Sequence, residues 1–128
     1  MMNQRKFIVL LIVLLTVSAG CQYGNASQGG FSMTTEEALS LWQAGEAVII
    51  DVRTQKEYQE GHIPDVLQIP LDQLEKRLEE VPQDRQVLLV CHSGRRSALG
   101  TNWLRSKGFE QVYNIEGGML AWHGPVVK

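Results

Sequence analysis

Cysteine and proline are scarce in this sequence, and neither sign of charge predominates. The 128 residues include two cysteines and four prolines, and twelve basic side chains nearly balance fourteen acidic ones. A formal net charge of −2 argues against a nucleic-acid partner, because nucleic acids select for clustered positive charge. The three histidines, His62, His92 and His123, are too widely separated for zinc-ligand spacing. We therefore expect neither a nucleic-acid partner nor a bound metal.

Long apolar runs are also rare, and the one that is present lies at the N-terminus. Arg5 and Lys6 precede it, residues 7–17 are almost continuously apolar, and the small residues 18–20 follow. This order is typical of a secretory signal peptide. At about 1.5 Å per residue the run spans roughly 16 Å, about half of a ~30 Å hydrocarbon core, which argues against a permanent membrane span. We expect residues 1–20 to be a signal peptide that is cleaved.

Cys21 directly follows these small residues. The junction VSAG–Cys21 resembles the lipobox of bacterial lipoproteins, in which the cysteine is lipidated and becomes the mature N-terminus. Ser18 stands where lipoboxes usually have Leu, so ordinary cleavage near Ala19 is the alternative. Several acyl chains, at about 0.8 kcal/mol per buried CH₂, hold a protein to a membrane far better than one chain. We expect an exported protein on a periplasmic or cell-surface face, anchored through Cys21 and a flexible tether over residues 21–30.

Residues 31–128 alternate between short apolar runs and amphipathic stretches, without an internal repeat. Aliphatic composition predicts buried strands at residues 47–52, 66–69, 86–90 and 112–115. Apolar spacing, capping residues and glycine stops predict helical segments at residues 34–45, 56–60, 71–81, 97–107 and 119–122. The fourth of these segments is expected to have one apolar helix face, formed by Ala98, Leu99, Trp103 and Leu104. Strands that are aliphatic on both faces and followed by helices indicate one α/β domain with a parallel sheet covered on both sides.

Polar residues stand at the ends of two of these strands, where α/β proteins gather their active groups. Asp51 and Arg53 follow the first predicted strand, and Cys91 follows the third. An Asp-x-Arg pair at a strand exit is more often an ion pair that holds loops together than a substrate contact, and we favour that role here. His62 is expected to stabilise its turn by a hydrogen bond.

Cys91 opens the segment CHSGRRS. A thiol is nucleophilic as the thiolate, and cations or helix N-terminal amides lower its pKa from about 8.5. A glycine three residues on permits several N–H groups to turn toward one point, and a helix beginning near Ser97 adds its positive end. The alternative is a small buried apolar residue at a strand end. We expect a nucleophilic Cys91 in an anion cradle formed by His92, Ser93, Gly94, Arg95, Arg96 and Ser97.

Phosphatases and arsenate reductases with a Cys-x-x-x-x-x-Arg loop are a competing class. Their arginine lies six positions after the cysteine, whereas position 97 is Ser here and Arg96 is five positions away. Tyrosine phosphatases also have His before the cysteine, where this chain has Val90. The shorter ring of amides fits a single sulfur better than a tetrahedral phosphate, so we rank this class below sulfur transfer.

Four segments, in this order and spacing, resemble the rhodanese family of single-domain sulfurtransferases: DVRTQKEYQEGHIP at 51–64, CHSGRRS at 91–97, GF at 108–109 and NIEGGMLAW at 114–122. The resemblance extends from residue 31 to about residue 127. It implies a five-stranded parallel α/β fold and a double-displacement reaction. Cys91 would take the outer sulfur of an anionic donor such as thiosulfate as a persulfide, then pass it to cyanide or a thiol. The cationic surroundings of the sulfur require no cofactor.

The chain departs from the family pattern at two places. His92 stands where Arg is frequent, so it is either a weaker, pH-dependent anion contact or a solvent-facing residue. Asp65-Val66 replaces the usual Gly-Ala, which puts the geometry of that turn in question. The pair Gly117-Gly118 is expected to allow close packing near the active crevice. A sulfur-carrier or persulfide-relay module, with another protein as the sulfur acceptor, remains the alternative function.

Overall fold

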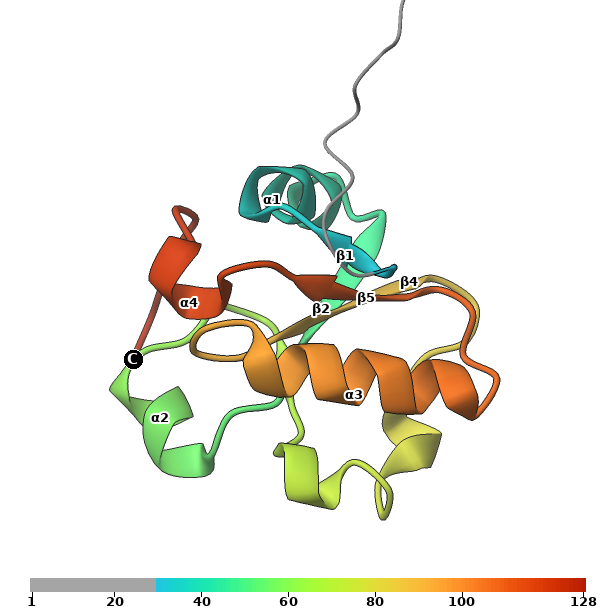
Figure 1. Ribbon diagram of the computed structural model, residues 1–128. Helices are drawn as coiled ribbons and strands as arrows, with labels where there is room; N and C mark the ends of the chain where they lie inside the picture. Colours follow the sequence, from blue (N-terminus) through green and yellow to red (C-terminus); the bar gives the residue numbers. More distant parts are fainter. Residues whose placement is uncertain (1–29) are drawn as a thin grey trace, which may run out of the picture.

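The computed structural model describes residues 30–128, which form a five-stranded parallel sheet covered by helices (Figure 1). In the order β1-β5-β4-β2-β3, every neighbouring pair is parallel. The strands are β1 (Ser32–Met33), β2 (Ala47–Asp51), β3 (Leu67–Gln68), β4 (Gln86–Val90) and β5 (Val112–Ile115). The predicted α/β class with five parallel strands is confirmed, and β4 is its central strand.

The helices lie on both sides of this sheet (Figure 1). One face is covered by α1 (Thr35–Gln43) and α4 (Gly118–Ala121), and the other by α3 (Arg95–Ser106). Two 3₁₀ turns, η1 (Leu71–Gln73) and η2 (Leu78–Glu80), lie on the α3 side, and α2 (Gln55–Glu60) follows the carboxyl end of β2. Cys91 follows β4 directly, so the Cys91 segment lies at the carboxyl edge of the sheet, as predicted.

Side chains of the central strand alternate between two apolar clusters. Val87, Leu89 and Cys91 pack on the α3 side, and Leu88 and Val90 pack on the α1 side. Each is at most 1% exposed. Full burial of one aliphatic side chain is worth about 1.5–3 kcal/mol, so the sheet supplies a rigid base for the polar segments at its carboxyl edge.

Two helices begin at capping boxes. Thr34 and Thr54 each accept a hydrogen bond from the backbone N–H three residues on, and Glu37 and Glu57 accept from the capping backbone in return. Such caps satisfy N–H groups that have no partner within the helix. The second capping box also fixes the position of Glu57, which contacts the Cys91 segment.

Several local predictions are wrong. The helix expected at residues 71–81 is replaced by η1 and η2, because Arg77 leaves the helical region at φ −117° and ψ 25°. Helix α3 begins at Arg95 rather than Ser97, since Gly94 adopts the left-handed conformation that precedes it. No strand was expected at Ser32–Met33, which pairs with β5 over only two residues. Leu99 is 63% exposed and lies outside the expected apolar face, whereas Leu104 is fully buried.

The turn after Ile63 has an unusual backbone conformation. Asp65 has φ 57° and is the one non-glycine residue with positive φ within residues 30–128. Aspartate tolerates the left-handed region better than most side chains do, because its short polar group bonds locally. The replacement of glycine at this position therefore leaves the turn intact.

The predicted signal peptide, the tether through residue 29 and the lipidation site Cys21 lie outside the described residues. Within residues 30–128, no helix combines the length and apolar character that a membrane crossing requires.

Candidate active site

The candidate site is built on the short segment between β4 and α3. Gly94 turns the chain at φ 95° and donates its backbone N–H to the Cys91 sulfur, with 3.1 Å between nitrogen and Sγ. A Cβ at Gly94 would lie 3.1 Å from the backbone nitrogen of Gly117, closer than side chains normally approach. Glycine is therefore needed here both for the left-handed turn and for close packing.

Helix α4 holds the same segment from the other side. The N–H groups of Met119 and Leu120 donate to the carbonyl oxygens of Cys91 and His92, at 2.8 and 3.1 Å. A Cβ at Gly118 would overlap the Cys91 carbonyl and lie 2.7 Å from the His92 carbonyl oxygen. The close packing predicted for the Gly117-Gly118 pair is confirmed.

The sulfur of Cys91 is enclosed by hydrogen-bonding groups. Cys91 is 1% exposed, and the fully buried Ser97 hydroxyl lies 3.2 Å from Sγ. The same hydroxyl lies 2.6 Å from Oδ1 of Asn114 on β5, whose Nδ2 donates to the Ser32 hydroxyl at 3.2 Å. The sequence analysis did not single out Asn114, although this residue begins the NIEGGMLAW segment that carries the family resemblance.

Two opposing effects act on the Cys91 thiol. Burial raises its pKa, because a charged sulfur loses hydration. Hydrogen bonds from the Ser97 side chain, and from the backbone N–H groups of Ser97, Gly94 and Ser93, lower the pKa and outweigh burial. The pKa of Cys91 therefore lies below its ordinary value, which favours the reactive thiolate.

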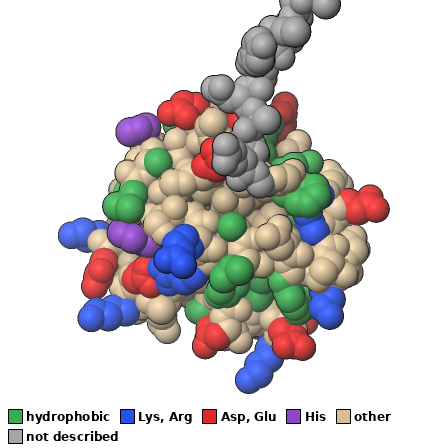
Figure 2. All heavy atoms as spheres, in the orientation of Figure 1, with side chains coloured by type: hydrophobic (Ala, Val, Ile, Leu, Met, Phe, Trp, Pro, Cys, Tyr) green, Lys and Arg blue, Asp and Glu red, His purple; other side chains and the backbone are tan. Residues whose placement is uncertain are grey.

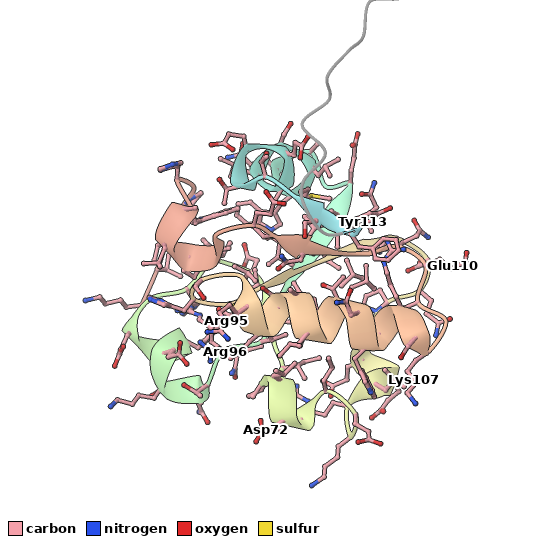
Figure 3. All side chains as sticks on the ribbon, viewed as in Figure 1. Asp72, Arg95, Arg96, Lys107, Glu110 and Tyr113 are labelled. Atoms are coloured by element: carbon pink, nitrogen blue, oxygen red, sulfur yellow. The ribbon has the colours of Figure 1, made fainter. Side chains whose placement is uncertain are left out.

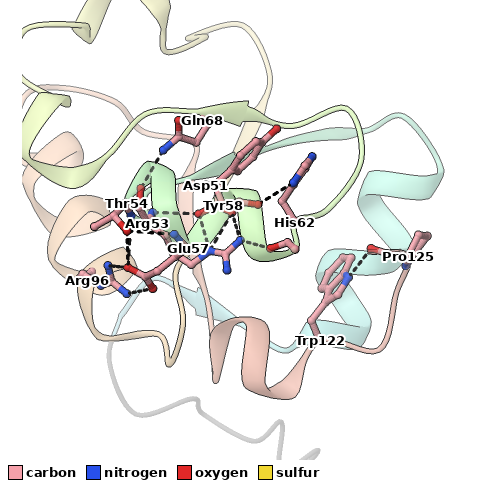
Figure 4. Close-up of polar contacts among 11 residues, drawn as sticks. Asp51, Arg53, Thr54, Glu57, Tyr58, His62, Gln68, Arg96, Trp122 and Pro125 are labelled. Atoms are coloured by element: carbon pink, nitrogen blue, oxygen red, sulfur yellow. Dashed lines mark hydrogen bonds and ion pairs between the residues drawn. The ribbon is translucent and has the colours of Figure 1, made fainter. Parts of the chain in front are cut away.

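Arg96 is held by an ion pair with Glu57 of α2 (Figure 4). Its Nη1 and Nη2 lie 2.7 and 2.8 Å from the two carboxylate oxygens of Glu57. The hydrogen bond from Arg96 is the main reason that the pKa of Glu57 falls to about 2, despite the opposing effect of burial. Thus Arg96 ties the start of α3 to α2, a role the sequence did not predict, because its partner is 39 residues away.

Arg95 lies beside Arg96 at the N-terminal end of α3, on the side of the molecule where α2 lies (Figure 3). It is exposed and makes no hydrogen bond or ion pair within residues 30–128. Figure 2 shows Lys and Arg side chains grouped beside a histidine on this part of the surface, with acidic side chains next to them. Arg95 is therefore the cation near the segment that is open to an anionic ligand.

Asp51 and Arg53 form a buried ion pair. Nη2 of Arg53 lies 2.7 Å from Oδ2 of Asp51, and it also donates to the carbonyl oxygen of Gly61 at 2.7 Å. The two side chains are at most 6% exposed, and Gln68 donates to the Arg53 carbonyl (Figure 4). These contacts join β2, the end of α2 and β3, as expected of the structural ion pair that we favoured.

His62 has the structural role that the sequence predicts. Its Nδ1 lies 2.9 Å from the carbonyl oxygen of Tyr58, and its ring stacks on the Tyr58 ring with 3.7 Å between centroids. Both residues help to close the turn after α2. His62 is therefore occupied by contacts within its own turn.

Two cavities flank the Cys91 segment. One, of about 310 Å³, includes Arg53, Glu57 and exposed His92 in its wall. The other, of about 550 Å³, includes Ser93, Gly94, Arg95, Asn114 and Glu116. Both volumes are large enough for a small anionic ligand. Within the described part of the chain, no three His, Cys, Asp or Glu side chains are grouped as a metal site.

These features define a class of site: a buried cysteine sulfur that accepts hydrogen bonds from a tight loop at the carboxyl end of the central strand of a parallel α/β sheet. The rhodanese-like domain family matches residues 34–125. The chain belongs to this family, and its general chemistry is sulfur transfer. Solved structures that are similar to this chain include rhodanese-like domains from Staphylococcus aureus and Anabaena.

Several known proteins are similar over most of this chain. A sulfurtransferase of Allochromatium vinosum is 40% identical over 96 residues, which cover 71% of this chain and 90% of that protein. The human single-domain sulfurtransferase TSTD1 superposes with a TM-score of 0.68 at 27% identity, covering 73% of this chain and 96% of TSTD1. A rhodanese-like domain protein of Staphylococcus aureus gives a TM-score of 0.68 at 34% identity, covering 73% and 91% of the two chains.

A longer relative is YrkF of Bacillus subtilis, which is named as a proposed sulfur carrier protein. It is 42% identical over 76 residues, which cover 59% of this chain. The aligned segment spans only 41% of the length of YrkF.

The Glu57–Arg96 pair predicts a pH-dependent contribution to stability. Because folding lowers the pKa of Glu57 from 4.5 to about 2, the pair stabilises the fold above pH 4.5 and loses this effect as the pH falls toward 2. We expect Glu57→Gln to lower the free energy of unfolding at pH 7 by up to about 1 kcal/mol, since the pair is partly exposed. Urea unfolding between pH 7 and pH 3 measures whether this difference shrinks.

Glu60→Gln on the same helix is the control, because Glu60 is exposed and forms no ion pair within residues 30–128. A loss of stability in Glu57→Gln that stays constant with pH, or that Glu60→Gln reproduces, would contradict the assigned role of the pair.

Proposed function

We propose that this protein moves sulfane sulfur from thiosulfate or a related anionic donor to cyanide or a thiol, through a persulfide on Cys91. The observation that carries the proposal is the environment of Sγ, which has the Gly94 N–H at 3.1 Å and the Ser97 hydroxyl at 3.2 Å. Hydrogen-bond donors in these positions stabilise an anionic sulfur without a metal or another cofactor.

The reaction has two half-reactions. In the first, the Cys91 thiolate attacks the outer sulfur of thiosulfate, the sulfur–sulfur bond of the donor breaks, and sulfite leaves with the electron pair. In the second, the acceptor attacks the outer sulfur of the persulfide, and the electron pair of the broken bond returns to Sγ. Cyanide becomes thiocyanate, and a thiol becomes a persulfide. Ser97 and Gly94 stabilise the charge on Sγ before the first step and after the second.

The donor anion is assigned to the mouth of the loop. Arg95 is exposed and has no ion-pair partner within residues 30–128, whereas Arg96 is engaged by Glu57. We propose that Arg95 binds the oxygens of the donor, and that His92 and the loop N–H groups contact the donor next to Arg95. Arg96 then serves mainly to hold the loop, and Ser93 and Ser97 lower the pKa of the nucleophile.

A sulfur-carrier role is the second candidate, and the similarity to YrkF favours it. The two candidates share the Cys91 persulfide and differ in the acceptor, which for a carrier is another protein. Discharge of the persulfide by cyanide or a small thiol at a rate that supports turnover supports the enzyme. A persulfide that small acceptors leave intact supports the carrier.

The first test removes the nucleophile. We expect Cys91→Ala to lower thiosulfate:cyanide sulfurtransferase turnover by at least about a thousandfold, because no other group in the loop can hold the sulfur. Cys21→Ala is the matched control and should keep full activity. Steady-state thiocyanate formation measures both variants, with circular dichroism to show that each is folded. Activity retained by folded Cys91→Ala would rule out the mechanism.

The second test removes the open cation. Arg95→Ala should raise the KM for thiosulfate by roughly tenfold, since a charge-assisted hydrogen bond is worth about 1.5–3 kcal/mol. Lys107→Ala removes an exposed cation from the opposite end of α3 and should leave the KM unchanged (Figure 3). Equal KM values for thiosulfate in both variants would assign donor binding to the loop N–H groups instead.

Export and lipid anchoring form a separate part of the proposal. The signal-like residues 1–20 and the following Cys21 support an exported domain that is held at a membrane by an acylated cysteine. Expression in bacteria, followed by mass spectrometry of the mature N-terminus, should find acylated Cys21 in the membrane fraction. Cys21→Ala should abolish the acylation. A mature N-terminus near Ala19 without lipid would show secretion without an anchor.

A further inference from the structure

A row of polar groups extends from the edge of the sheet to the Cys91 sulfur. Asn114 is 6% exposed and lies between Ser32 of β1 and the fully buried Ser97 of α3. The distances along the row are 3.2 Å from Ser32 Oγ to Asn114 Nδ2, 2.6 Å from Asn114 Oδ1 to Ser97 Oγ, and 3.2 Å from Ser97 Oγ to Sγ. Each member is within hydrogen-bond reach of the next.

The Ser97 hydroxyl cannot satisfy both neighbours as a donor, because it has one proton. When Cys91 is a thiol, its S–H can donate to Ser97 Oγ while the Ser97 proton goes to Oδ1 of Asn114. When Cys91 is a thiolate, the Ser97 proton must go to the sulfur. Oδ1 of Asn114 then faces a hydroxyl that no longer donates to it, which is unfavourable for a buried acceptor.

A half-turn of the Asn114 amide resolves this conflict. It brings Nδ2 to Ser97 Oγ as a donor and Oδ1 to the Ser32 hydroxyl, which can donate in turn. The whole row then points its protons toward the sulfur, whereas in the thiol state they point away from it. Along the row from Ser32 to Sγ, the two arrangements have the same number of hydrogen bonds and opposite direction.

We propose that Asn114 is a positioning residue for Cys91: its amide reverses with the protonation state of the sulfur, and thereby directs the Ser97 proton toward or away from Sγ. Asparagine is suited to this role, because it offers a donor and an acceptor that a half-turn exchanges. A carboxylate at this position can only accept, and an aliphatic side chain can do neither.

This role rests on the proposed function, in which charge on Sγ comes and goes in every turnover. The nucleophile and the final leaving group carry the charge on Sγ, whereas the persulfide carries it on the outer sulfur. The row therefore points toward Sγ while the charge is there, and in the persulfide, whose Sγ has neither charge nor proton, the Ser97 proton can return to Asn114. Asn114 contributes by keeping both directions of the row available.

Charged groups that could also act on Cys91 surround the loop on several elements. They are Arg96 with its partner Glu57 on α2, the Asp51–Arg53 pair after β2, His92 and Arg95 on the loop and at the start of α3, and Glu116 after β5. Arg96 also interacts with Cys91 through its charge. None of these groups is altered in the variants below, so their effects are common to all of them.

The test compares Asn114→Asp with Asn102→Asp in the full chain. Both changes add a carboxylate to the wall of the same 550 Å³ cavity, but Asn102 is exposed and makes no hydrogen bond to Ser97. The readout is the pH dependence of Cys91 alkylation by iodoacetamide, followed by mass spectrometry on the Cys91 peptide so that Cys21 does not contribute. Thermal unfolding checks that each variant is folded.

We expect Asn114→Asp to lower the proton dissociation constant of Cys91 by about tenfold or more, which corresponds to a pKa about one unit higher. We expect Asn102→Asp to leave this constant nearly unchanged. The same Asn114→Asp change is then made in a Ser97→Ala background. In that background the new carboxylate still repels a negative charge on Sγ. It no longer has a Ser97 hydroxyl whose proton it can hold away from the sulfur. A shift at least about threefold smaller in that background supports the role, and an equal shift overturns it.

Asn114→Leu keeps the result interpretable if Ser97→Ala does not fold. This change removes the amide without adding charge and leaves the Ser97 proton free for the sulfur, so Cys91 should ionise nearly as in the unmodified chain. A shift as large as that of Asn114→Asp would assign the effect to packing and overturn the role. Alkylation reports thiol ionisation, not sulfur transfer, so the role of Asn114 and the proposed function fail separately.

Discussion

The carbonyl oxygens of Cys91 and His92 accept hydrogen bonds from the N–H groups of α4, and this pairing decides the shape of the loop that holds the sulfur. It requires the backbones of two loops to approach so closely that a Cβ at Gly118 would overlap the Cys91 carbonyl. With these carbonyls engaged on one side, Gly94 turns its N–H to the sulfur on the other. Backbone geometry thus directs a hydrogen-bond donor at the sulfur before any side chain is considered.

Side chains then decide how reactive the sulfur is. Burial at the end of β4 favours the neutral thiol, whereas the Ser97 hydroxyl and the loop amides favour the thiolate and prevail. The two arginines that follow differ in their contacts, since Arg96 is bound by Glu57 whereas Arg95 has no ion-pair partner within residues 30–128. The anion site that we propose therefore combines a loop held by Arg96 with the exposed side chain of Arg95.

The sequence predicted those features that depend on local patterns. The QVLLV run, apolar in four of its five residues, predicts a buried strand, and Thr34 predicts the start of α1, because burial and capping are read along the chain. Contacts between distant segments were not accessible in this way. Glu57 pairs with an arginine 39 residues away, and Asn114 bonds to Ser32 across 82 residues, so neither partner leaves a local signal. The two-residue strand β1 exists only through its pairing with β5.

The central claim is that Cys91 carries sulfur as a persulfide. Intact-protein and peptide mass spectrometry of the reduced chain, before and after thiosulfate and again after cyanide, tests it most directly. The account predicts the gain of one sulfur atom on the Cys91 peptide and its complete removal by cyanide. No gain on demonstrably reduced Cys91 would contradict the proposed transfer from thiosulfate, and a gain confined to Cys21 would contradict the assignment of the site.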